Sequence, residues 1–189
     1  MNALKRALLA FAAVTVIAPA SAQVGGYEGD QFVSAIRKHD NDQALKLLQD
    51  HATVVNARDL NGNTALSAAI ENEDYDWTGY LLRLGADPNA AIRNGDTPLI
   101  LASRVGFEDA VKWLLGLGAS VDATNRMGET SLIVAVQRRQ VPIVRLLLNA
   151  GANPDKTDSA QGYSARDYAK RDNRTPELLR IIEAKKPAR

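Results

Sequence analysis

Residues 95–103, GDTPLILAS, carry the pattern that decides the fold. Gly95 lies among polar residues, where a tight turn needs a residue that tolerates positive φ. The Thr97 hydroxyl can accept a hydrogen bond from a free backbone N–H at the start of a helix, and Pro98 fits the first helical position because no N–H is lost there. The stretch therefore predicts a turn that leads directly into a short helix.

The pattern recurs with a period of 33 residues. GNTALSAAI (62–70) precedes it and GETSLIVAV (128–136) follows it. Each copy is closed by a second motif with a leucine pair and a Gly-Ala ending, namely LLRLGADPN (81–89), LLGLGASVD (114–122) and LLNAGANPD (147–155). The leucine pair predicts a second helix, and the glycine predicts the left-handed residue that ends it. Since such a period is typical of stacked repeats, we expect an all-α fold of paired antiparallel helices with short β-turn tips.

The two motifs closely resemble the ankyrin repeat, over about residues 28 to 184. The tetratricopeptide repeat has a similar period, but it lacks the Gly-Thr turn and the Gly-Ala ending. The resemblance implies a solenoid of five repeats. We assign an N-terminal capping repeat to residues 28–56, full repeats to 57–89, 90–122 and 123–155, and a divergent C-terminal capping repeat with its tail to 156–189.

Three departures from the repeat pattern stand out. His51 replaces the glycine that ends the first repeat, and we expect it to take the left-handed conformation because histidine tolerates it. Arg166 and Asp167 bring charge to normally apolar positions of the last repeat, as a polar cap on an open stack requires. Ile92 stands where the family usually has Asp. The matching residues of the other repeats are Asp59, Asn125 and Asp158.

The first 22 residues have the pattern of a Sec-type signal peptide. Lys5 and Arg6 precede an apolar run, and ASA at 20–22 supplies the small residues of a cleavage site. The run is about half of the roughly 20 residues that a membrane anchor needs, so we expect cleavage after Ala22 rather than a retained anchor. No cysteine follows the apolar run, which excludes a lipoprotein anchor. Lys5-Arg6 is not a twin-arginine pair, which excludes a twin-arginine export signal. We expect a short linker at 23–27 and a periplasmic or secreted protein without stable membrane insertion.

The charge balance and the absence of cysteine argue against several classes of function. Removal of Lys5 and Arg6 leaves 21 basic and 22 acidic side chains, and this near balance argues against a nucleic-acid partner. The charges are unevenly spread, because residues 23–122 hold 8 basic and 15 acidic side chains whereas 123–189 hold 13 and 7. The sequence has no cysteine, which excludes a disulfide framework and thiol chemistry.

No catalytic or metal-binding pattern is evident. There is no Gly-x-Ser-x-Gly elbow, phosphate-binding loop or His-Glu-x-x-His motif, so we expect no cofactor, no metal and no enzymatic activity. ENEDYD (71–76) lacks the central glycine and the final glutamate of a calcium loop, and we interpret it as a solvated turn between helices. GLGAS (116–120) follows a helix rather than a strand, which predicts a helix end rather than a dinucleotide site. Trp77 and Trp113 fall on second helices, where we expect buried packing.

The side chains that the repeat pattern leaves free are the candidate partner contacts. In ankyrin proteins such residues form a concave surface from the turn tips and the end of the first helix. Carried over by position, they are Arg58, Asn61, Asn63, Glu71, Arg93, Asn94, Asp96, Arg104, Arg126, Met127, Glu129 and Arg138. We expect its four second- and third-repeat arginines to line one groove, because a planar guanidinium suits carboxylates and protein interfaces. These are Arg93, Arg104, Arg126 and Arg138.

The resemblance implies a non-catalytic protein-protein interaction module of the bacterial periplasm, a monomer with a protein partner of unknown identity. A more specific alternative follows from small periplasmic ankyrin proteins that are associated with peroxide defence. The chain would then support a partner enzyme such as a catalase. The remaining alternative is an unrecognised enzyme that uses carboxylates such as Glu71 and Asp74.

Overall fold

The computed structural model describes residues 27–184, which form ten α-helices and one 3-10 helix. Within this range β-structure is limited to three isolated bridges at the tips, so the all-α expectation is confirmed. None of these helices has the length and apolar character to span a bilayer. The expected signal at 1–22 and the linker up to residue 26 lie outside the described residues. The chain divides into two compact units, one up to Asp87 and one from Pro88, and each is considered by itself.

The first unit is built around a buried tryptophan. Its helices are α2 (Tyr27–Arg37), α3 (Asn41–Asp50), the 3-10 helix η1 (Ala52–Asn56), α4 (Ala65–Glu71) and α5 (Tyr75–Arg83). Trp77 of α5 is fully buried, with its ring centroid 6.3 Å from that of Phe32 and 5.7 Å from that of Tyr80. Its Nε1 donates to Asn41 Oδ1 at 2.7 Å, so the predicted buried packing of Trp77 is confirmed.

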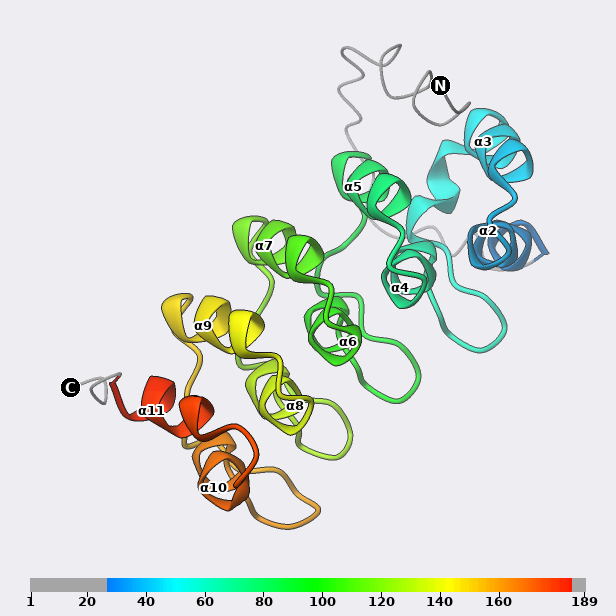
Figure 1. Ribbon diagram of the computed structural model, residues 1–189. Helices are drawn as coiled ribbons and strands as arrows, with labels where there is room; N and C mark the ends of the chain where they lie inside the picture. Colours follow the sequence, from blue (N-terminus) through cyan, green and yellow to red (C-terminus); the bar gives the residue numbers. More distant parts are fainter. Residues whose placement is uncertain (1–26, 185–189) are drawn as a thin grey trace. The chain divides into compact units, whose positions relative to one another are not determined.

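The second unit contains three helix pairs that lie side by side (Figure 1). They are α6 (Pro98–Val105) with α7 (Glu108–Gly116), α8 (Ser131–Gln137) with α9 (Val141–Asn149), and α10 (Ala165–Arg171) with α11 (Pro176–Ala184). First helices pack on first helices and second helices on second helices. The loops before α6, α8 and α10 therefore form neighbouring tips on one side of the unit (Figure 1).

The hydrogen bonds and backbone angles at the helix ends are those that the sequence predicts. Thr64, Thr97 and Thr130 each accept a hydrogen bond from the backbone N–H three residues later, at 3.1 to 3.3 Å. Pro98 occupies the first turn of α6, as predicted. The three glycines that end the second helices all have φ between 82° and 97°. These are Gly85, Gly118 and Gly151.

The prediction for His51 is wrong. His51 has a φ of −143°, because the chain leaves α3 directly into η1 and needs no left-handed residue there. The left-handed histidine is His39, at φ 57° in the turn between α2 and α3. Glu73, Gly106 and Arg139 have positive φ in the corresponding turns of later repeats, so the requirement belongs to the interhelical turn.

Neighbouring tips of the second unit are joined through their backbones. Arg126 N–H donates to the Asn94 carbonyl at 3.2 Å, and Ser159 N–H donates to the Met127 carbonyl at 2.8 Å. A Cβ at Gly128 would lie 2.6 Å from the Ser159 nitrogen, so glycine is required there by close approach as well as by its φ of 75°. These contacts fix the position of each tip against the next.

Candidate functional site

The twelve candidate contacts fall at the tips and first-helix ends of both units. Four of them belong to the first unit, namely Arg58, Asn61, Asn63 and Glu71. The other eight belong to the second unit, namely Arg93, Asn94, Asp96, Arg104, Arg126, Met127, Glu129 and Arg138.

In the first unit a buried carboxylate organises the tip. Asp59 is 7% exposed, and its Oδ1 accepts from the backbone N–H groups of Asn61 and Asn63 at 2.9 and 2.8 Å. Its Oδ2 accepts from Asn63 Nδ2 at 2.9 Å. Burial by itself raises the pKa of Asp59, but the bonds from Asn63 and Asn61 and the charge of Arg37 outweigh it and lower that pKa below its usual value. Asn63 therefore serves the tip itself.

The other three candidates of the first unit are exposed. Arg58 donates from Nη1 to the Gly62 carbonyl at 2.7 Å and so lies along its own tip. Asn61 extends from that tip, and Glu71 is the last residue of α4. The acidic run that begins at Glu71 forms the predicted interhelical turn, because the Asp74 side chain caps α5 by accepting from Trp77 N at 2.9 Å.

In the tip before α6 of the second unit, the buried carboxylate lies at a different position from that of Asp59 in the first unit. Ile92 occupies the position of Asp59 and has no side-chain oxygen to offer its tip, and the buried acid of this tip is Asp96, which is 1% exposed. Asp96 Oδ2 accepts from Asn94 Nδ2 at 2.7 Å, while Asn94 Oδ1 accepts from Asp96 N at 2.9 Å. The expectation that Asp96 is left free by the scaffold is therefore wrong, and Asn94, although exposed, uses its side chain in closing the tip.

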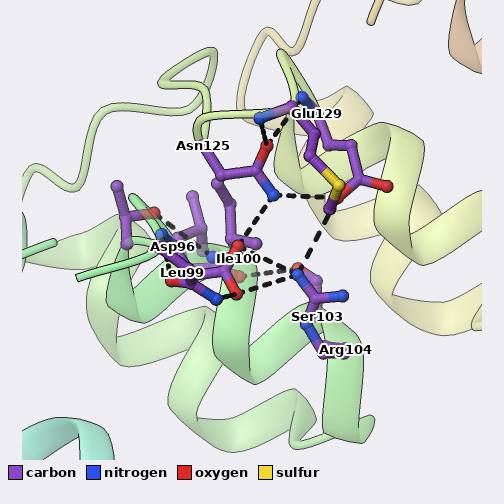
Figure 2. Close-up of polar contacts among 10 residues, drawn as sticks. Asp96, Leu99, Ile100, Ser103, Arg104, Asn125 and Glu129 are labelled. Atoms are coloured by element: carbon purple, nitrogen blue, oxygen red, sulfur yellow. Dashed lines mark hydrogen bonds and ion pairs between the residues drawn. The ribbon is translucent and has the colours of Figure 1, made fainter. Parts of the chain in front are cut away.

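Asp96 also connects its own tip to α6 and to the next tip (Figure 2). Arg104 Nη2 donates to both Asp96 oxygens at 2.9 Å, and Asn125 Nδ2 donates to Asp96 Oδ1 at 2.8 Å. The Asn125 amide in turn donates to Glu129 Oε2 at 2.8 Å. One buried carboxylate thus holds three separate segments together, which requires no ligand.

The same cluster fixes the direction of the Arg104 guanidinium. The Arg104 side chain is 28% exposed, and its Nη2 also lies 3.9 Å from Glu129 Oε2. Its Nε and Nη1 make no hydrogen bond within residues 27–184. The expectation of four equivalent free arginines is therefore corrected, because the Arg104 charge is compensated by Asp96. What Arg104 offers is an oriented donor rather than a free cation.

Apart from Asn94, the exposed candidates of the second unit are basic and apolar. Arg93 and Arg126 are exposed on neighbouring tips, and the Met127 side chain is 51% exposed. We call Arg93, Arg104, Arg126, Met127 and Glu129 the tip face. Arg138 is exposed as well, but it lies at the end of α8 in the turn to α9.

The last tip shows a further arrangement that the repeat pattern did not reveal. Tyr168 of α10 donates its hydroxyl to Asp158 Oδ2 at 2.5 Å. Burial and this bond raise the pKa of Tyr168, whereas for Asp158 the bonds from Tyr168 and the backbone outweigh burial and lower the pKa. The buried polar residue of each tip is therefore bonded differently in different repeats. Among the described residues, no group of three or more His, Asp and Glu is arranged to hold a metal ion.

Family models of known proteins match the sequence of the repeats described above. Residues 80–158 match the family model described as ankyrin repeats in three copies, and residues 61–92 match the model of the ankyrin repeat. The two matches together span 61–158, which is more than half of the chain. No curated protein matches the sequence.

Proposed function

Because the chain belongs to the ankyrin repeat family, we propose that it binds a partner protein through the tip face of its second unit. Ankyrin repeats are protein-protein interaction modules and are generally not catalytic, so the chain is an interaction module. The choice of the tip face is supported by one observation above all. The Asp96 cluster holds the partly exposed Arg104 in a fixed orientation, in a unit that also exposes Arg126 and Met127.

Such a surface is suited to association. Arginine and methionine are enriched in protein interfaces, and arginine is common among the residues that dominate binding energy. A side chain that is already ordered loses little conformational entropy when a partner binds. The backbone bonds between neighbouring tips extend the same advantage to the loops. The tip face therefore presents donors and an apolar contact at low entropic cost.

We also propose that the chain acts in the periplasm, which is supported by the signal pattern at 1–22. A role in supporting a partner enzyme such as a catalase stays a prediction from the resemblance. For the carboxylate-enzyme alternative, the structure supplies Asp74 with a structural role as the cap of α5.

The proposal predicts that two substitutions on the tip face abolish partner binding. Arg126→Glu with Met127→Asp reverses a charge and removes an apolar contact at exposed positions. Loss of an interface centre costs about 2 kcal/mol or more, so we expect proteins captured from periplasmic extract to fall at least about tenfold. Quantitative mass spectrometry of the captured proteins measures this, with circular dichroism as a check of folding.

The chain offers a matched control. Arg83→Glu with Leu117→Asp makes the same chemical changes at the ends of second helices, where Arg83 is exposed and Leu117 is 53% exposed. We expect this control to capture the same proteins as the unmodified chain. If the tip-face variant also retains them, the tip face is not the binding surface.

A further inference from the structure

The interhelical turns of the last two repeats carry an excess of positive charge. Their basic residues are Arg138, Arg139, Lys170, Arg171 and Arg174. Within 137–141 and 170–174 the only acidic residue is Asp172, whereas the corresponding stretch 104–108 has one arginine and one glutamate. The excess is therefore a property of these two repeats and not of the turn in general.

One ion pair fixes the two turns beside each other. Arg139 donates from Nε and Nη2 to the two oxygens of Asp172 at 3.0 and 3.2 Å. The bond from Arg139 holds the pKa of Asp172 below its usual value, so the carboxyl stays ionised and paired. Asp172 Oδ1 also accepts from the Arg174 backbone N–H at 3.0 Å. Asp172, the single acid of the two turns, is thus already bonded to Arg139 and to the backbone of Arg174. The side chains of the other cations in the turns form no ion pair with it.

Arg139 makes this pair from an unfavourable backbone conformation. Its φ is 56°, in a turn where the repeat before it has Gly106 at 91°. Residues other than glycine rarely adopt the left-handed region, because their Cβ lies too close to the backbone carbonyl oxygen. The two-point bond to Asp172 gives the residue a role there that glycine could not fill.

The remaining four cations form a surface that we call the basic strip, consisting of Arg138, Lys170, Arg171 and Arg174. All four are exposed. In the part of the chain that the structure describes, none of their side chains forms an ion pair. The Arg171 guanidinium carbon lies 3.9 Å from the centroid of the Tyr163 ring, and this stacking leaves its N–H donors able to bind an anion.

We propose that the basic strip binds an extended acidic segment of the partner protein. This inference rests on the proposed function, because it specifies the chemistry of the partner. Arg138 follows the last residue of α8 and Arg171 is the last residue of α10, so they lie at neighbouring ends of packed helices, which are about 8–10 Å apart. An extended chain advances about 3.3 Å per residue, so acidic residues three positions apart match the strip.

The charge of the whole chain favours a short acidic segment over a long polyanion. After loss of the expected signal, basic and acidic side chains are nearly equal in number, and residues 27–87 alone hold 11 acidic side chains against 5 Lys and Arg. Nucleic acid binding usually accompanies a strong basic excess. A peptide that contacts two repeats needs only the local excess of the basic strip.

A labelled peptide tests the inference. The probe is (Glu-Gly-Ser)4 with a terminal fluorescein, and the same peptide with Gln for Glu is its neutral counterpart. The strip variant combines Arg138→Glu, Lys170→Glu and Arg174→Glu, which removes no ion pair within residues 27–184. By fluorescence anisotropy at low salt, we expect the variant to bind the acidic peptide at least about tenfold more weakly than the unmodified chain. Added salt is expected to weaken the binding further, since exposed charges are screened.

Matched variants separate this inference from the proposed function. The control triple is Lys38→Glu, Lys46→Glu and Arg83→Glu, which makes the same change in net charge at exposed positions of the first unit. It is expected to bind the peptide normally, as is the tip-face variant Arg126→Glu with Met127→Asp.

Four results would overturn the inference. They are equal weakening by both triples, no difference between the Glu and Gln peptides, loss of peptide binding in the tip-face variant alone, and tighter strip-dependent binding of a single-stranded oligonucleotide of equal charge. The first three leave capture through the tip face intact, so the two proposals can fail separately.

Discussion

Replacing Asp96 by alanine is expected to lower the free energy of unfolding by about 2–4 kcal/mol. Removing one partner of a buried ion pair costs about 3–5 kcal/mol, and the lower range applies because the Arg104 side chain is 28% exposed and regains some hydration. The change also leaves the Asn94 amide without its acceptor and removes one of the two acceptors of the Asn125 amide. Urea denaturation followed by circular dichroism measures the difference.

An exposed ion pair of the same unit provides the control. Asp109 and Lys112 lie 3.0 Å apart on α7, with side chains 49% and 50% exposed. Asp109→Ala is expected to cost less than about 1 kcal/mol, because exposed pairs contribute little. If the two alanine variants lose the same stability, Asp96 is not the residue that holds the tips together.

Replacing Trp77 by alanine is expected to cost about 3–5 kcal/mol, the largest loss from a single core position in the first unit. The substitution removes a fully buried ring that packs against Phe32 and Tyr80, and it leaves Asn41 Oδ1 without its donor. Since the site is enclosed by three helices, the neighbouring side chains can fill the cavity only in part. Thermal and urea unfolding report the loss.

Trp113 is the natural comparison because it also lies on a second helix. Its ring is half-buried and contacts Phe107 edge to face, with centroids 6.3 Å apart. Trp113→Ala is expected to cost about 1–2 kcal/mol, less than Trp77→Ala, because folding buries less apolar surface of Trp113 than of Trp77. A larger loss at Trp113 than at Trp77 would contradict the burial described for the two rings.

The repeated helix pairs could be predicted from sequence because each depends on chemistry that is local. Thr97 caps α6 through a residue three positions away, and Gly118 ends its helix through its own φ. Such features recur whenever the residue types recur. The period therefore predicted the turn and helix pair of each full repeat, whereas the 3-10 helix η1 was not predicted.

The polar residues at the tips could not be assigned in the same way. Whether Asp96 is exposed depends on Arg104 eight residues later and on Asn125 in the next repeat. The presence of Ile92 in place of the usual acid indicated that this tip is bonded differently. It did not indicate which neighbouring residue supplies the buried carboxylate instead. His39 and His51 show the same limit, because His39 is left-handed in the turn between α2 and α3, whereas the direct passage from α3 into η1 leaves His51 with a negative φ.

The candidate contacts were predicted as single exposed positions, and many are exposed. Arg93, Arg126 and Met127 are accessible, as the repeat pattern indicates. The arginines were expected to line one groove together with Arg104, but the compensation of the Arg104 charge by Asp96 was not predicted, because pairing with a buried acid cannot be read from spacing. The surface is accordingly a fixed donor among exposed basic and apolar side chains, rather than a groove of four equal cations.

Site-specific photo-crosslinking distinguishes the tip face from the other exposed surface of the second unit. Benzoylphenylalanine placed at Met127 on the tip face and, separately, at Leu117 at the end of α7 compares two similarly exposed apolar positions, 51% and 53% exposed. After irradiation in periplasmic extract, binding through the tip face predicts a discrete protein adduct from position 127 and none from position 117. The same adduct from both positions, or an adduct from position 117 alone, would contradict binding through the tip face.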